Sequence, residues 1–186
     1  MRILGVTASS YELYTAFESI ASSALGSDTA SVTFSSIPNT YQHLQLRMLV
    51  KNDSTTSNVR PVYLRFNSDS GSNYVYHNLV GNGSSASSGN WTGYSYVELG
   101  LTTASSTGLS NNFGVFLVDI HDYASTSKNQ TVRTFSGTEQ NGSGYSQLYS
   151  GLWLNTNAIN SITLLCAGTQ KFVTGSTFAL YGIKGA

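Results

Sequence analysis

Apolar and polar residues alternate in the stretch His43-Leu44-Gln45-Leu46-Arg47-Met48-Leu49-Val50. Successive side chains of an extended strand point to opposite faces. The apolar residues at positions 44, 46, 48 and 50 therefore share one face, and the polar residues at 43, 45 and 47 share the other. This period of two predicts a β-strand that buries one face and leaves the other to solvent.

The same period recurs along the chain at the spacing typical of sandwiches and jelly rolls. Val62, Leu64 and Phe66 share a face, and residues 113–120 are apolar on both faces, which predicts a central strand covered on both sides. Further strands are predicted at residues 31–34, 73–80, 94–99, 131–136, 147–154, 161–166 and 178–184. We therefore predict an all-β fold, an antiparallel β-sandwich of the jelly-roll type with an extended N-terminal arm.

The composition supports few helices and one domain. Charged residues make up 10% of the 186 residues, against about 25% in an average soluble protein. The wet face of an ordinary helix needs Glu, Lys, Arg and Ala, and that supply is missing here. The length suits a single core. We predict that residues 1–12 form the arm and residues 13–186 form one sandwich domain.

Two segments leave the pattern of strands. Near the start, apolar residues recur at helical spacing, which slightly favours a short helix: Leu13, Phe17, Ile20, Ala21 and Ala24. Residues 81–89 are almost entirely Gly, Ser and Asn, and this composition predicts a mobile surface loop.

The residues that could carry catalysis are sparse and scattered. The Gly-x-Ser-x-Gly turn of many serine hydrolases is absent, and no spacing pairs two carboxylates for glycoside hydrolysis. His121 lies close to Asp119 and Asp122, but a strand end running into a turn explains this cluster better than a metal site, which needs ligands from several segments. His43 and His77 are expected on polar surfaces. We predict no catalytic residue, no metal site and no cofactor.

The surface chemistry points to contact with other proteins. The net charge is zero and no run of Lys or Arg occurs, so we expect neither nucleic acid nor membrane as a partner. A chain without net charge has little protection from self-association. The proposed arm contributes apolar side chains that need a partner, and we take them as a candidate anchor or interface: Ile3, Leu4, Val6, Tyr11 and Leu13.

Aromatic residues form the second candidate surface. They could line a sugar-binding surface or a subunit interface, or they could pack in the core, and we expect roughly half of each. The set is Tyr74, Tyr76, Trp91, Tyr94, Tyr96, Tyr145, Tyr149 and Trp153. Trp91, beside the Gly/Ser segment, and Tyr94 are the candidates for an exposed contact.

A series of short motifs extends from about residue 17 to the C-terminal end. It comprises Val32-Thr33-Phe34-Ser35-Ser36-Ile37-Pro38-Asn39-Thr40-Tyr41-Gln42-His43-Leu44-Gln45-Leu46-Arg47, Leu64-Arg65-Phe66-Asn67, Asp69, Gly71, Asn73-Tyr74, Asp119-Ile120-His121-Asp122-Tyr123, Lys128, Thr131-Val132-Arg133 and Phe178-Ala179-Leu180-Tyr181-Gly182-Ile183-Lys184-Gly185. In order and number these motifs resemble a family of small virion structural proteins of tailed phages. The start Gly5-Val6-Thr7-Ala8-Ser9-Ser10 is similar to the start of other phage surface proteins.

The resemblance implies a β-sandwich on the surface of the virion, either on the capsid or in the tail. It also implies a strand, rather than a helix, at residues 17–25. The expected function is a capsid decoration or cement protein, with the major capsid protein or another virion protein as partner. The alternative is a tail fibre or receptor-binding protein that recognises glycan on the host surface. We expect the working unit to be a homo-oligomer, and a trimer follows from the symmetry of phage particles rather than from any residue.

Overall fold

The computed structural model describes residues 16–107 and 109–185. Within these residues the regular structure is β-strand, apart from one 3-10 turn at Ser105–Thr107. The strands are β1 (Phe17–Ala24), β2 (Ser31–Phe34), β3 (His43–Asn52), β4 (Val59–Phe66), β5 (Tyr74–Gly81), β6 (Ala86–Tyr94), β7 (Val97–Ala104), β8 (Gly114–His121), β9 (Gln130–Glu139), β10 (Gly144–Trp153), β11 (Ile162–Cys166) and β12 (Thr177–Ile183). The prediction of an all-β fold is confirmed.

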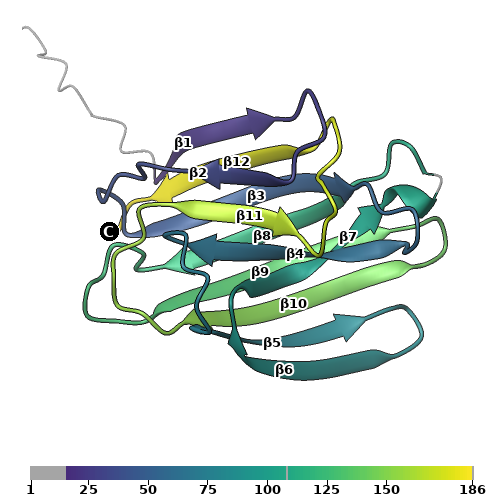
Figure 1. Ribbon diagram of the computed structural model, residues 1–186. Coiled ribbons are helices and arrows are strands. Elements are labelled where there is room, and N and C mark those ends of the chain that lie inside the picture. Colours follow the sequence, from purple (N-terminus) through teal and green to yellow (C-terminus); the bar gives the residue numbers. More distant parts are fainter. Residues whose placement is uncertain (1–15, 108, 186) are drawn as a thin grey trace, which may run out of the picture.

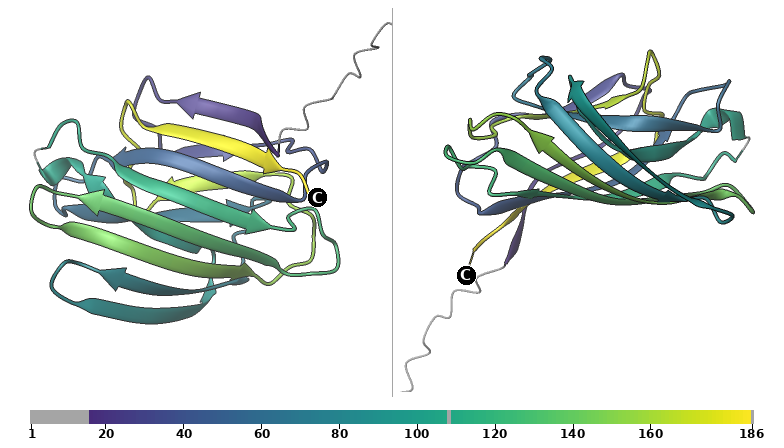
Figure 2. Two further views of the ribbon diagram at one scale, coloured as in Figure 1. Left: turned by 180° about the vertical axis from the view of Figure 1, so that it is seen from behind. Right: turned by 90° about the horizontal axis from the view of Figure 1, so that it is seen from below.

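The strands form two layers that face each other (Figures 1 and 2). The large layer has the antiparallel order β1-β12-β3-β8-β9-β10-β5-β6, and the small layer has the antiparallel order β2-β11-β4-β7. The layers are joined where β3 pairs in parallel with β7, at Lys51 with Thr103 and Asn52 with Ala104. The sheet is therefore mixed, and this short parallel pair departs from the purely antiparallel arrangement that we predicted.

The core lies between the layers, and the alternating stretch supplies its centre. In β3 the side chains of Leu44, Leu46, Met48 and Val50 are all buried, as the period of two predicts. The strand β4 of the small layer buries Val62, Leu64 and Phe66 in the same way, as the sequence also predicts. Its neighbour β11 buries Ile162, Leu164 and Cys166. Burial raises the pKa of the Cys166 thiol, so this cysteine is a packing residue.

Strand β8 is central in the large layer but covered on one face only. Its inward residues Phe116 and Val118 are 1% and 0% exposed, whereas the outward Val115 and Leu117 are 53% and 37% exposed. The position between β3 and β9 agrees with the prediction. The prediction of cover on both sides is wrong for a single chain, because the second layer lies against only one face of the sheet (Figure 2).

The segment with helical spacing is the edge strand β1. Seven residue pairs join it to β12, with a bulge between Ser19 and Ala21. The strand implied by the phage resemblance is therefore confirmed, and the spacing of Phe17, Ile20 and Ala24 was misleading. Leu13, the first residue of that spacing, lies outside the described residues.

The predicted loop at residues 81–89 is largely strand. Residues from Ala86 onward form β6, which pairs with β5 along its whole length. Only a short turn remains, in which the Asn82 side-chain oxygen accepts hydrogen bonds from the amides of Ser84 and Ser85. Low sequence complexity did not prevent pairing, since the ladder bonds come from the backbone. The predicted strand at residues 94–99 is likewise displaced, because Tyr94 ends β6 and β7 begins at Val97.

Polar side chains take part in the core where the layers meet near β7. The Gln147 amide on β10 clamps the backbone of Leu101 on β7, accepting from its N–H at 2.9 Å and donating to its carbonyl at 3.2 Å. Asn52 donates to the carbonyl of Thr103 at 3.1 Å. A chain rich in amides and hydroxyls can therefore close its core with hydrogen bonds in place of further aliphatic packing.

Candidate functional site

The outer face of the large layer carries a continuous group of exposed apolar side chains. Eight large apolar residues of the described chain are strongly exposed, and six of them lie together on this face, while Phe17 stands apart on the edge strand β1, where its ring centroid is 5.9 Å from the Arg47 guanidinium. We call these six the apolar stripe: Leu49 on β3, Val115 and Leu117 on β8, Phe135 on β9, Leu148 on β10 and Leu79 on β5. Isolated exposed apolar residues are common, but a contiguous group marks an interaction site.

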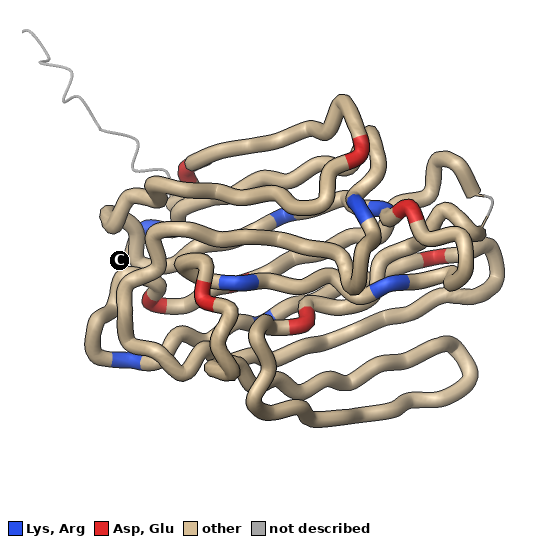
Figure 3. The backbone as a smooth tube through the Cα atoms, viewed as in Figure 1, with Lys and Arg blue, Asp and Glu red and all other residues tan. Residues whose placement is uncertain are grey.

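Strand register makes these residues direct neighbours. Leu117 lies opposite Phe135, Phe135 opposite Leu148, and Leu148 opposite Leu79. Opposite residues of antiparallel strands have Cβ atoms about 5 Å apart, so one row of apolar side chains crosses β8, β9, β10 and β5. Leu49 and Val115 form a second pair in the adjacent row. At the end of the stripe formed by Leu148 and Leu79, the strands β5, β6 and β10 contain no Lys, Arg, Asp or Glu (Figure 3).

The stripe borders a hollow in the same face. The hollow has a volume of about 470 Å³ and lies over β1, β12, β3 and β8. Its walls include Leu49, Val115 and Leu117 of the stripe together with Thr177 and Ala179. Beside the hollow, Phe135 is the most exposed large apolar side chain, at 64%. The face thus combines a projecting ring with an apolar depression.

A polar row closes one side of the stripe. The Arg133 guanidinium lies 3.5 Å from the Asp119 carboxylate, which also accepts a hydrogen bond from the Gln45 amide at 2.9 Å. Arg47 donates to Gln45 at 2.9 Å, and its guanidinium lies 5.3 Å from the Tyr181 ring centroid. Asp119 and Arg133 therefore neutralise each other within the chain. Arg47 lies opposite Leu117, in the row of the stripe, and its guanidinium contacts Gln45 and aromatic rings rather than a carboxylate.

Two histidines that the sequence analysis treated separately lie together at the end of the outer face. The rings of His43 and His121 are 5.0 Å apart between centroids, because β3 and β8 are neighbouring strands. The Asp122 amide donates to His43 Nδ1 at 3.0 Å, and a hydrogen bond from Lys128 holds the pKa of the Asp122 carboxyl below its usual value. Within residues 16–107 and 109–185, no three His, Cys, Asp or Glu side chains are grouped to hold a metal ion.

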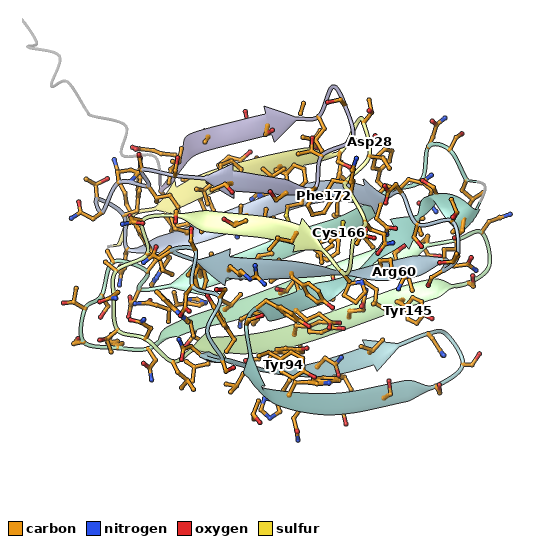
Figure 4. All side chains as sticks on the ribbon, in the orientation of Figure 1. Asp28, Arg60, Tyr94, Tyr145, Cys166 and Phe172 are labelled. Carbon is orange, nitrogen blue, oxygen red and sulfur yellow. The ribbon has the colours of Figure 1, made fainter. Side chains whose placement is uncertain are left out.

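The aromatic residues divide between core and margin, as expected. Four of the eight are buried (Tyr74, Tyr76, Tyr149 and Trp153), and the other four are partly exposed. The Trp91 and Tyr94 rings both contact Tyr76, at centroid distances of 5.1 and 5.6 Å. Tyr94 lies beside the β5–β6 hairpin in Figure 4. Both candidate contacts are therefore partly buried residues at the rim of the core.

A carboxylate lies within this aromatic group. Glu98 on β7 accepts a hydrogen bond from the Tyr149 hydroxyl at 3.0 Å. Burial raises the pKa of Glu98, although the hydrogen bonds from Tyr149 and Tyr76 act in the opposite direction. No sequence pattern signals this contact, since Glu98 and Tyr149 are 51 residues apart.

The loop at Asn67–Gly71, which has a faint likeness to a calcium loop, uses its carboxylate to hold the fold. Asp69 accepts hydrogen bonds from the Gly71 amide at 2.8 Å, the Asn73 amide group at 2.9 Å and the Trp153 indole N–H at 2.7 Å. The arrangement is a turn that anchors the largest side chain of the core.

The candidate anchor lies outside the described residues, and this applies to all five of its apolar members, Ile3, Leu4, Val6, Tyr11 and Leu13. Within the described part of the chain, no helix is long and apolar enough to cross a membrane. Comparisons with protein-family models, with curated proteins and with solved structures found no match to this chain.

Proposed function

We propose that this chain is a non-enzymatic structural protein of a tailed-phage virion, and that it decorates the outer surface of the capsid. The observation that carries the proposal is the apolar stripe, a sheet face that no other part of the described chain covers. Such a face favours a subunit whose working state is an assembly. The charge-poor composition fits the same role, because copies without net charge repel one another little.

The fold that we propose with this role is a β-sandwich of the jelly-roll type preceded by an N-terminal arm. The facing layers of strands support the sandwich. The motifs shared with small phage virion proteins support the location on the virion. We propose the major capsid protein or another virion protein as the partner, contacted through residues 1–12, and a homo-oligomer, with trimer expected from particle symmetry.

The absence of an enzymatic role is also a proposal. It is supported by the structural partners of the acidic side chains that come nearest to an acid–base arrangement. Asp119 pairs with Arg133, Asp122 pairs with Lys128, and Glu98 binds Tyr149. Each carboxylate already holds two strands or a turn in place. Replacing Asp119, His121 and Asp122 by Asn, Gln and Asn should leave the biological role intact when the fold is preserved.

The alternative is a tail protein that binds host glycan, and one feature favours it. The Trp91 ring lies over the backbone of Gly89, where a Cβ atom would be 2.4 Å from the indole. A flat indole at the margin of the molecule is a suitable platform for a sugar ring. A glycan role predicts loss of binding to host cells on Trp91→Ala, whereas the decoration role predicts no change.

The deciding experiment is quantitative mass spectrometry of purified particles of the phage that encodes the chain. Hundreds of copies per particle would support the capsid role, and a few copies would support the tail. If the protein is absent from particles, the proposed function is wrong. Deletion of residues 1–10 should leave a folded domain that no longer joins the particle, and full occupancy by the truncated chain would disprove the anchor.

A further inference from the structure

We infer that the apolar stripe is the contact between two copies of this chain, packed face to face about a two-fold axis that runs along β8. The inference rests on the proposed assembly role and names the partner of the same surface. It is carried by the size of the stripe, by its fit to itself, and by the pattern of charges around it. Each of these is set by residues of the described chain.

The first argument is area. The six exposed side chains of the stripe present an apolar patch on the order of 500 Å², which is large for a monomer. A stable interface of standard size needs about 800 Å² from each partner. The hollow, which Thr177 and Ala179 line, and a second depression beside Leu79 and Leu148, which Ser146 and Ala86 line, extend the surface toward that size.

The second argument is shape. A two-fold contact must be self-complementary, so that a feature of one copy meets its counterpart on the other. Phe135 projects from β9, and the hollow lies over β3 and β12 on the other side of β8. An axis along β8 brings β9 of one copy over β3 of its partner. Each Phe135 ring then enters the hollow of the other copy, and Leu117 meets its own counterpart.

The third argument is the match of rows. An axis parallel to the strands keeps each residue row opposite the same row of the partner. The row of Leu117 and Phe135 continues on β3 at Arg47, so each Phe135 ring meets Arg47 of the other copy, whose guanidinium lies over the Tyr181 ring in its own chain and can contact a second aromatic ring. In the polar row, Asp119 meets its own counterpart, with Arg133 of each copy beside it. Arg133 is well exposed and opposes the partner's β3, where Gln45 lies beside Asp119.

The contact replaces the simple trimer expected from particle symmetry with an even number of copies. A two-fold contact cannot close a ring of three, so this face gives a dimer. If a separate three-fold contact exists elsewhere on the molecule, the two together give six copies. A mass that is an even multiple of the chain mass of 19.9 kDa is therefore expected in either case.

The test is the mass of the purified full-length chain by sedimentation and light scattering over a range of concentrations. We expect an even number of copies for the unaltered chain, and a rise of at least about 100-fold in the dissociation constant for Phe135→Lys, which removes a central ring and places a second positive charge against Arg47 of the other copy. Leu148→Asp is a second variant at the same face. The matched control is Leu154→Asp, since Leu154 is 49% exposed and lies beyond the end of β10, off the stripe. It should leave the mass unchanged.

Circular dichroism of each variant checks that the strands persist, which we expect because Phe135 and Leu154 are both exposed. A monomer at high concentration, a pure trimer, or a dimer that Phe135→Lys and Leu148→Asp leave intact would overturn the inference. None of these results would remove the protein from the particle, so failure of the inference is separate from failure of the proposed function. Leu117→Cys should also form a disulfide-linked dimer on mild oxidation, whereas Leu154→Cys should not, and the reverse result would exclude the axis along β8.

Discussion

On β8, the two faces of the large layer carry similar apolar side chains but differ greatly in how far those side chains are buried. On β8 the inward Phe116 and Val118 are buried under the small layer, while the outward Val115 and Leu117 are open. All four are apolar, so composition alone gives the faces the same character. The difference teaches that an apolar strand face indicates that burial is favourable, but not that other residues of the described chain supply it.

Strand β9 makes the same point in reverse. Its inward residues Thr134 and Ser136 are fully buried, while the outward Phe135 is largely exposed. Burial and hydrophobicity are thus opposed on one strand. The inward hydroxyl groups lie under β7, where Ser136 donates to the carbonyl of Leu99 at 3.4 Å. An outward Phe beside buried hydroxyls is costly for an isolated molecule, and this favours a covered outer face in the assembly.

The largest expected effect separates the two faces of β8. Phe116→Ala should lower the free energy of unfolding by about 3–5 kcal/mol, because it leaves a cavity between the layers. Leu117→Ala should cost less than about 1 kcal/mol in the monomer. Urea unfolding of both variants at low protein concentration measures the difference. Equal losses would show that the outer face of β8 is covered within one chain.

How far the sequence predicts a strand depends on whether its own side chains or a distant segment determine its pairing. The alternation in β3 and β4 is decisive because one face packs on the other layer and the opposite face is polar. Strand β6 was missed because its residues are small and polar, and its pairing with β5 uses the backbone. Strand β1 was ambiguous because Phe17, Ile20 and Ala24 fit helical spacing, and the choice depended on β12, far along the chain.

The candidate site was less accessible to sequence analysis than the fold. Leu79, Leu117, Phe135 and Leu148 come from four strands, and only the register places them side by side. The one available signal was the doubly apolar run at residues 113–120, which we interpreted as a fully covered strand. His43 and His121 were separated for the same reason, since their contact depends on pairing between distant segments.

Two glycines sharpen the comparison of the faces. A Cβ atom on Gly151 would lie 2.4 Å from Val97 of the small layer, whereas one on the outward Gly137 would meet nothing closer than 3.7 Å. Gly151→Ala should therefore destabilise the fold by about 1–3 kcal/mol through overpacking. Gly137→Ala should change stability by less than about 0.5 kcal/mol. Thermal unfolding of the pair tests this, and a neutral Gly151→Ala would mean that the layers can separate without cost at β10.

At the end of the covered face, Asp69 should make stability depend on pH. Burial opposes ionisation of Asp69, but hydrogen bonds from Asn73, Trp153 and Gly71 outweigh it and lower the pKa below the ordinary 3.8. The stability that the ionised group contributes is present above pH 3.8 and is lost as the pH falls through the lowered pKa.

Asp69→Asn should cost about 1 kcal/mol at neutral pH, since the Asn73 and Trp153 donors share one carboxylate oxygen and lose it as an acceptor, and it should remove this acid-dependent loss. Urea unfolding of the unaltered chain and the variant at several acidic pH values measures both effects. If the two chains lose stability in parallel as the pH falls, the Asp69 carboxylate does not hold Trp153 in the way that the geometry indicates.

The smallest expected effect concerns Glu98 on β7, at the edge of the region buried between the two layers. Burial raises the pKa of Glu98 above its ordinary 4.5, so the folded state binds a proton more tightly than the unfolded state. For such a group, stability falls as the pH rises from 4.5 to the raised pKa and is then constant.

Glu98→Gln keeps an acceptor for the Tyr149 hydroxyl and removes the charge. The variant should match the unaltered chain at about pH 4 and exceed it by less than about 1 kcal/mol at about pH 7. A variant that is less stable at neutral pH would show that the ionised carboxylate is well solvated, and that the cover of the inner face ends before it reaches Glu98.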